Sequence, residues 1–109
     1  MNKKLKRICE NLDWNIREYE TDIELAKYSP AGEDFFFTVN KTNFVDEVII
    51  YAEEFDADEH AEMWVNNMHE VKGVPQSIRT LIEDADAIKE MLLELAKELS
   101  IRSKKLWKI

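Results

Sequence analysis

Apolar and polar positions follow two periods along the first 40 residues, and each period predicts one kind of element. Apolar residues from about Asn2 to Leu12 share one helical face, which predicts a short helix. From Trp14 to Tyr19, Ile23 to Tyr28 and Asp34 to Val39 the pattern favours strands, by alternation in the first two and by the run of phenylalanines in the third. The connections are short, and the loop at 29–33 contains the turn formers Pro and Gly. The three strands are therefore expected to form an antiparallel meander.

Helical spacing returns after residue 40 and predicts three further helices. Asn43 is a suitable N-cap for a helix from Phe44 to about Glu54. Asp56 is a suitable N-cap for a second helix that packs Trp64 into the core and ends before Gly73 and Pro75. The expected fold class is α+β: an N-terminal helix, a three-stranded antiparallel sheet, and three helices packed on one face.

The last predicted helix has the most regular pattern in the chain. Its apolar residues are spaced alternately by three and four positions, and Ser77 is a suitable cap: Ile78, Leu81, Ala85, Ile88, Leu92, Leu95 and Leu99. Ile82, Leu93 and Ala96 widen this heptad seam, so packing against the chain's own sheet is favoured over a free-standing zipper. The tail from Ile101 to Ile109 either continues the helix or frays. Its Trp107 docks on the domain, on a partner or on a membrane surface.

Composition restricts the size and setting of the protein. The 109 residues, 45% of them hydrophobic and with two Gly and two Pro, indicate a single domain of long elements at 1–109, whose basic ends at 1–8 and 100–109 are the parts that could fray. The single cysteine, Cys9, excludes an intramolecular disulfide and fits a reducing compartment, and its place on the apolar helical face indicates a core residue. No apolar run reaches about 18 residues and no signal peptide is visible, which predicts a cytoplasmic protein without a membrane segment.

The charge is distributed unevenly along the chain. The formal net charge is −8. All 23 Asp and Glu lie between Glu10 and Glu98, while every charged side chain before and after these positions is Lys or Arg. Such an acidic body repels nucleic acid at long range and attracts a basic protein surface. Acidity that serves only solubility is the alternative. The acidic residues Glu83, Asp84 and Asp86 are expected to form a solvated face near the start of the last helix.

Common enzyme motifs are missing from the sequence. Two isolated glycines cannot form a phosphate-binding loop, and no G-x-S-x-G elbow occurs. One Cys with two His gives no local cysteine-protease signature. We therefore predict that the protein is not an enzyme.

A zinc site is the most specific chemical hypothesis, and it uses Asp56, His60 and His69. Carboxylates and imidazoles are ordinary zinc ligands. The two histidines are nine positions apart, which puts them on opposite faces of one continuous helix. They could share an ion only if the helix ends near 66–67 or if other ligands take part. The alternative is that His60 borders the core beside Trp64 while His69 is exposed.

Four segments of the chain together resemble a known group of proteins. They cover about two thirds of the sequence: YSPAGEDFFFTV (28–39), FDADEHAEMWV (55–65), GVP (73–75) and IRTLIEDADAIKEMLLELAKEL (78–99). The pattern is similar to that of small acidic proteins from phages, prophages and mobile elements of Firmicutes. That resemblance names no activity and carries over no functional residue. It implies a context in which inhibitors of host defence, including anti-CRISPR and antirestriction proteins, are frequent.

These observations lead to three hypotheses of function. The first is a non-enzymatic phage or prophage inhibitor in the bacterial cytoplasm, which docks an acidic surface on a basic, nucleic-acid-binding defence nuclease such as a Cas effector. Its binding residues would be the expected exposed carboxylates Glu53, Glu54, Asp58, Glu59 and Glu62. The second is a small zinc-binding structural or regulatory module. The third is a module that dimerises through the last helix, and the sequence leaves monomer and homodimer open.

Overall fold

The structure is a computed structural model that describes residues 1–66 and 78–107. In chain order the elements are α1 (Lys3–Asn11), β1 (Asn15–Glu18), β2 (Asp22–Tyr28), β3 (Asp34–Asn40), α2 (Phe44–Glu54), α3 (Ala57–Asn66) and α4 (Ile78–Trp107). The predicted α+β class and order of elements are confirmed. The predictions for His69, Gly73, Pro75 and Ser77 lie outside the described residues.

The three strands form an antiparallel sheet in the order β1-β2-β3, which is the meander that the short connections predict. In the pairing of β2 with β3, Ile23 lies opposite Val39 and Leu25 opposite Phe37, and all four side chains are buried. The other face of the sheet carries Phe36 and Tyr28, which are 59% and 66% exposed. The sheet therefore has one apolar covered face and one open face.

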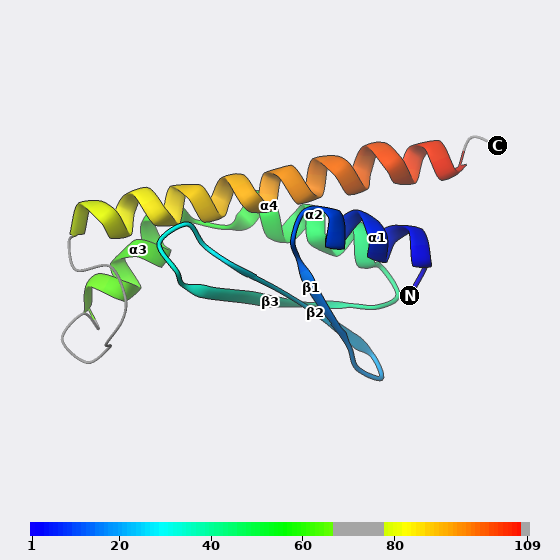
Figure 1. The fold of residues 1–109 in the computed structure, drawn as a ribbon, viewed down its shortest axis with the longest axis horizontal. Coiled ribbons are helices and arrows are strands. Elements are labelled where there is room, and N and C mark those ends of the chain that lie inside the picture. The colour runs from blue at the N-terminus through cyan, green and yellow to red at the C-terminus, as the bar shows by residue number, and fades with distance from the viewer. Residues whose placement is uncertain (67–77, 108–109) are drawn as a thin grey trace.

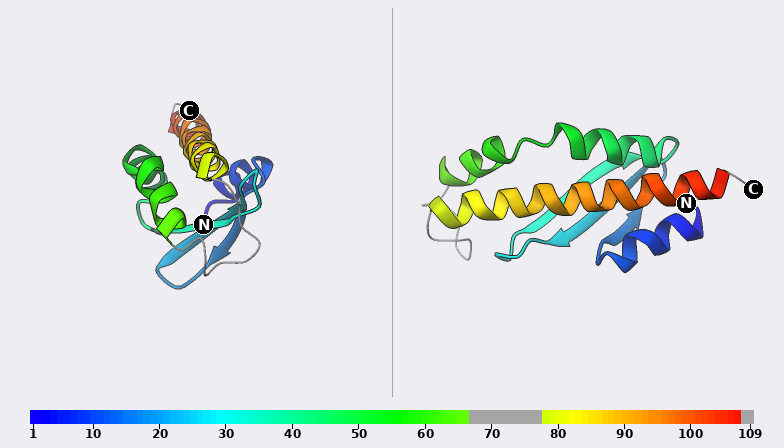
Figure 2. Two further views of the ribbon diagram at one scale, coloured as in Figure 1. Left: turned by 90° about the vertical axis from the view of Figure 1, so that its left-hand side faces the viewer. Right: turned by 90° about the horizontal axis from the view of Figure 1, so that it is seen from above.

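The helices cover the buried face of the sheet in one layer (Figure 1). Seen from above, α4 runs along the middle of this layer, with α2 and α3 in a row on one flank and α1 on the other (Figure 2). A helix of 30 residues is about 45 Å long, so α4 spans the domain. The end-on view shows the sheet below this layer of helices (Figure 2).

Two of the helix starts have a side-chain cap, and a third has the predicted N-cap residue without the side-chain hydrogen bond. The Oδ1 atom of Asn2 accepts a hydrogen bond of 2.7 Å from the backbone N–H of Lys4. Asp56 caps α3 as predicted, because its Oδ1 accepts from the N–H of Glu59 at 3.1 Å. Asn43 occupies the N-cap position of α2 as predicted, and its backbone carbonyl accepts a hydrogen bond of 2.9 Å from the N–H of Glu47, but its side chain makes no capping hydrogen bond. The structure begins α2 at Phe44 all the same, with Phe44 buried in the core.

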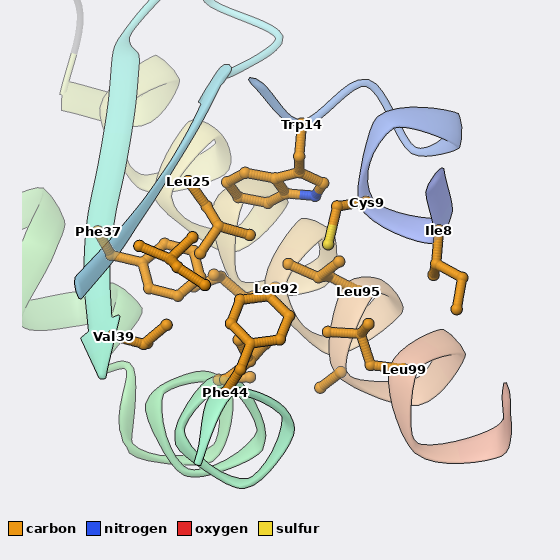
Figure 3. Packing of buried hydrophobic residues seen from close by; sticks show 14 of the residues in the cluster. Ile8, Cys9, Trp14, Leu25, Phe37, Val39, Phe44, Leu92, Leu95 and Leu99 are labelled. Carbon is orange, nitrogen blue, oxygen red and sulfur yellow. The ribbon is translucent and has the colours of Figure 1, made fainter. Parts of the chain in front are cut away.

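The core lies between the sheet and the helix layer, and α4 contributes more buried residues to it than any other helix (Figure 3). The described seam residues of α4 are all buried: Leu81, Ala85, Ile88, Leu92, Leu95 and Leu99. The widened stripe is only partly confirmed, because Ala96 is buried while Ile82 and Leu93 are 45% and 43% exposed. Since the seam packs inside the chain, a dimer formed through it would have to open the domain.

The tail of α4 remains helical through Trp107. The sequence left open whether the tail continues the helix or frays, and the structure shows that residues 101–107 continue it. The last turns of α4 lie beside α1, so the two basic ends of the sequence meet at one end of the molecule (Figure 2).

Candidate functional site

The five carboxylates expected to bind a partner are all exposed. We call this set, Glu53, Glu54, Asp58, Glu59 and Glu62, the acidic face. It lies on the C-terminal end of α2 and on α3, which follow each other along one flank of α4 (Figure 2). Residues 42–66 contain eight Asp and Glu and no Lys or Arg. The negative potential of this flank is therefore not offset by a cation from its own helices.

A shallow hollow of about 330 Å³ adjoins the acidic face and gives it shape. Its lining combines apolar, carboxylate and imidazole groups: Phe55, Asp56, Glu59, His60 and Met63. Met63 is 50% exposed. Long basic side chains place an aliphatic stem along apolar surface and keep the charged head near acceptors. The hollow can therefore receive a lysine or an arginine from another protein.

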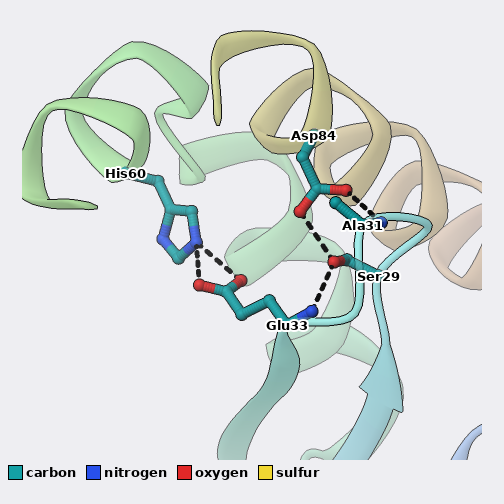
Figure 4. Close-up of polar contacts among 5 residues, drawn as sticks. All are labelled: Ser29, Ala31, Glu33, His60 and Asp84. Atoms are coloured by element: carbon teal, nitrogen blue, oxygen red, sulfur yellow. Dashed lines mark hydrogen bonds and ion pairs between the residues drawn. The ribbon is translucent and has the colours of Figure 1, made fainter. Parts of the chain in front are cut away.

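His60 holds α3 against the sheet. Its Nε2 atom lies 2.9 Å and 3.1 Å from the two carboxylate oxygens of Glu33, at the start of β3 (Figure 4). The imidazole also packs edge-on against Phe35, with ring centroids 5.8 Å apart, and beside Phe55 at 5.3 Å. The side chains of His60 and Glu33 are only 14% and 9% exposed. His60 is thus a positioning residue for the helix that carries most of the acidic face.

Asp84 is buried, which corrects the prediction that it belongs to a solvated face with Glu83 and Asp86. It is 8% exposed. Its Oδ2 accepts a hydrogen bond of 2.7 Å from the Ser29 hydroxyl, and its Oδ1 accepts one of 2.9 Å from the N–H of Ala31 (Figure 4). The Ser29 Oγ in turn accepts from the N–H of Glu33 at 2.9 Å. Asp84 therefore ties the 29–33 loop to α4.

Lys89 fixes the turn between α2 and α3. Its ammonium group donates to the carbonyl of Ala52, and to those of Glu53 and Phe55 at 3.0 Å and 2.9 Å. These carbonyls lie at the end of α2, where a helix leaves acceptors unpaired and where its dipole favours a cation. Together, Lys89 and His60 set how the two halves of the acidic face lie relative to each other.

Sequence reasoning missed the positioning roles of Glu33, Asp84 and Lys89, although the helical spacing of two of them contained a signal. Asp84 is three residues after Leu81 and four before Ile88, so it falls on the buried seam. Lys89 stands four residues after Ala85, at the border of that seam. No local signal in the sequence pairs Glu33 with His60, because the two residues are 27 positions apart and the residues between them form other elements.

Two of the three predicted zinc ligands lie near each other, and the third is not described. Asp56 and His60 line the same hollow, while His69 lies outside the described residues. Glu33 occupies the Nε2 of His60, which leaves Nδ1 as the nitrogen that could face a metal. Within residues 1–66 and 78–107 no group of three or more His, Cys, Asp or Glu is arranged to hold an ion. A structural zinc needs four ligands, so this hypothesis depends on residues beyond the described ones.

The zinc hypothesis predicts one zinc per chain in protein purified without added metal. Because a structural metal contributes its binding free energy to folding, a chelator should then lower the melting temperature, and His60→Ala should lose the metal. Elemental analysis and thermal denaturation with and without chelator measure both quantities. Protein that contains no zinc and melts at the same temperature in chelator would leave His60 with its structural role alone.

Cys9 is a core residue, as its place on the apolar face of α1 predicts. It is fully buried, and burial raises the pKa of its thiol to about 12. A thiol with such a pKa stays protonated at neutral pH and is a poor nucleophile. The cysteine therefore offers no catalytic chemistry.

Comparisons with protein-family models, curated proteins and solved structures gave no match for this chain. The resemblance to mobile-element proteins thus rests on the sequence segments quoted above and stays a prediction. Among the helices in the described part of the chain, none is long and apolar enough to cross a bilayer.

Proposed function

We propose that the protein is a non-enzymatic inhibitor of phage or prophage origin, which acts in the bacterial cytoplasm on a host defence nuclease such as a Cas effector. It would bind the basic groove in which that nuclease holds nucleic acid. The observation that carries the proposal is the acidic face: five exposed carboxylates on a flank whose helices contain no Lys or Arg. The mobile-element resemblance supplies the context.

The physical basis is electrostatic complementarity. Grooves that bind DNA or RNA are lined by Lys and Arg that contact phosphates. Carboxylates held at the surface of a folded domain are negatively charged, as phosphates are, and can therefore bind the same Lys and Arg side chains. Complementary potentials steer the two proteins together and speed association, and this contribution weakens as salt screens the charges.

The hollow beside the acidic face supports a defined contact within this interaction. An arginine or lysine of the nuclease would lay its stem on Phe55 and Met63 and direct its charged head to Asp56 and Glu59. Such a partly desolvated basic side chain is the kind of residue that contributes most to binding at protein interfaces. The hollow thus gives the partner a shaped contact for one side chain, in addition to the charge of the acidic face.

Neutralising the acidic face should weaken inhibition about 100-fold, since five exposed ion pairs contribute several tenths of a kcal/mol each. The variant is Glu53→Gln, Glu54→Gln, Asp58→Asn, Glu59→Gln and Glu62→Gln in one chain. The measurement is DNA cleavage by a panel of purified Cas effectors and restriction nucleases, with increasing inhibitor at two salt concentrations. Inhibition by the unmodified protein should fall as salt rises.

A matched control distinguishes the effect of the acidic face from the effect of the net charge of the protein. It replaces five exposed carboxylates elsewhere by their amides: Glu10, Glu20, Asp34, Glu90 and Glu94. Both variants change the net charge equally, so only loss in the acidic-face variant supports the proposal. Equal loss in both, or an unmodified protein that inhibits no nuclease of the panel, would contradict it.

A further inference from the structure

A cavity of about 570 Å³ lies between α1 and the last turns of α4. Its lining comes from two segments more than 80 residues apart in sequence: Lys4, Arg7, Ile8 and Asn11 on α1, and Glu98, Ile101 and Arg102 on α4. The residues of each helix are spaced by one, three or four positions, so each helix turns one face to the cavity. The cavity belongs to neither the acidic face nor its hollow.

The cavity gathers three cations, and two of them have no ion pair with another described residue. Lys4 and Arg7 are exposed, and neither has an ion pair with any other described residue. Arg102 is only partly neutralised: its Nε donates to Glu98 at 3.3 Å, and its side chain remains 60% exposed. Three cations thus face one carboxylate. Like charges brought together by folding repel each other, and an anion placed among them removes that repulsion.

The lining also defines the chemistry of the anion. Lys and Arg are the side chains that bind phosphate groups, Arg through two parallel hydrogen bonds. Ile8 forms a buried part of the wall and Ile101 is 43% exposed, so an apolar or planar group can pack beside the cations. The amide of Asn11 can donate and accept hydrogen bonds. The volume falls within the range of about 300 to 1,000 Å³ typical of small-molecule sites.

We propose that this cavity binds a phosphate-bearing organic ligand of the nucleotide class. The phosphate would lie among Lys4, Arg7 and Arg102, and the base or sugar would contact the isoleucines. The same chemistry is present in a free nucleotide and in the phosphorylated end of a nucleic-acid strand. The site is independent of the proposed inhibitory function, because α1 lies at the opposite end of α4 from α3 (Figure 2).

The test is isothermal titration calorimetry of the full chain with three probes: AMP, a 5′-phosphorylated ten-nucleotide DNA strand, and the same strand with a 5′-hydroxyl. Lys4→Gln with Arg7→Gln should weaken binding about tenfold or more, since each change removes a charge-assisted hydrogen bond. Glu98→Gln should strengthen it, because it frees Arg102 and removes the one negative charge of the lining. Lys3→Gln is the control for the loss of one positive charge elsewhere on α1, as Lys3 is exposed and does not line the cavity.

The probes distinguish the two sources of phosphate. Saturable binding of AMP assigns the cavity to free nucleotides, while binding of only the 5′-phosphorylated strand assigns it to strand ends. The proposal is overturned if no probe binds, if both strands bind alike, or if Lys3→Gln weakens binding as much as the double variant. Circular dichroism of each variant confirms that the helices are intact, and the opposite direction expected for Glu98→Gln cannot arise from unfolding.

Discussion

Replacing Trp14 by alanine should lower the free energy of unfolding by about 4 kcal/mol, the cost typical of emptying a buried Trp site. Trp14 is 1% exposed and stands at the junction of α1 and the sheet (Figure 3). Its indole packs edge-on against Phe37 and Phe35, with ring centroids 5.6 Å and 6.4 Å apart. A domain of this size is stable by only about 5 to 15 kcal/mol, so the variant would lose a large part of its stability.

Two further variants test whether the loss of stability comes from the space that the missing Trp14 indole leaves in the core. Trp14→Phe keeps most of the ring and removes the indole N–H, which is buried without a hydrogen-bond partner among the described residues. It should therefore cost less than half as much as alanine. Tyr28→Ala removes an aromatic ring that is 66% exposed and should cost less than about 1 kcal/mol. Urea denaturation measures all three, and a Trp14→Ala midpoint close to that of Tyr28→Ala would contradict the core described above.

Replacing Asp84 by alanine should cost about 3 kcal/mol, because it leaves buried polar groups without their partner. The Ser29 hydroxyl and the Ala31 N–H both lose their acceptor on α4. Asp84→Asn keeps the shape and one acceptor oxygen, so it should cost less. Asp86→Ala is the matched control, since Asp86 is an exposed carboxylate two residues away on the same helix.

The second prediction has a local readout besides stability. Hydrogen exchange at the amides of Ala31 and Glu33 should accelerate in Asp84→Ala, because both amides are held by the Ser29–Asp84 contacts. Amides in the middle of α2 should change only in proportion to global stability. Unchanged protection at Ala31 would show that Asp84 does not hold the loop.

The periodic parts of this fold were predictable from sequence, and the parts that depend on a distant partner were not. Alternation, β-favouring runs, capping residues and heptad spacing depend only on neighbouring residues, and they predicted the three strands, the bounds of α2 and the buried seam of α4. Asn43 stands at the N-cap of α2 as predicted, yet its side chain makes no capping hydrogen bond, because a suitable residue type does not guarantee the geometry of that bond. Ile82 and Leu93 were expected to be covered, yet no described element lies over them closely enough to bury them.

The candidate sites divide in the same way. The exposure of the acidic face followed from helical position, whereas its positioning residues did not, because Glu33, Asp84 and Lys89 act on partners 27 or more residues away. The cationic cavity was not predicted either. Basic residues at both ends of the chain were visible in the sequence, but only the direction in which α4 returns brings Arg102 next to Lys4 and Arg7.

The central place of α4 has a consequence for synthesis on the ribosome. This helix supplies Ile88, Leu92, Leu95 and Leu99 to the core, and it is translated after every other described element. Until it leaves the exit tunnel, the apolar face of the nascent sheet lacks the central helix of its cover (Figure 2). Such exposed apolar surface is what chaperones bind and what aggregates. We therefore expect the domain to complete its folding only after the whole helix has emerged, rather than element by element during translation.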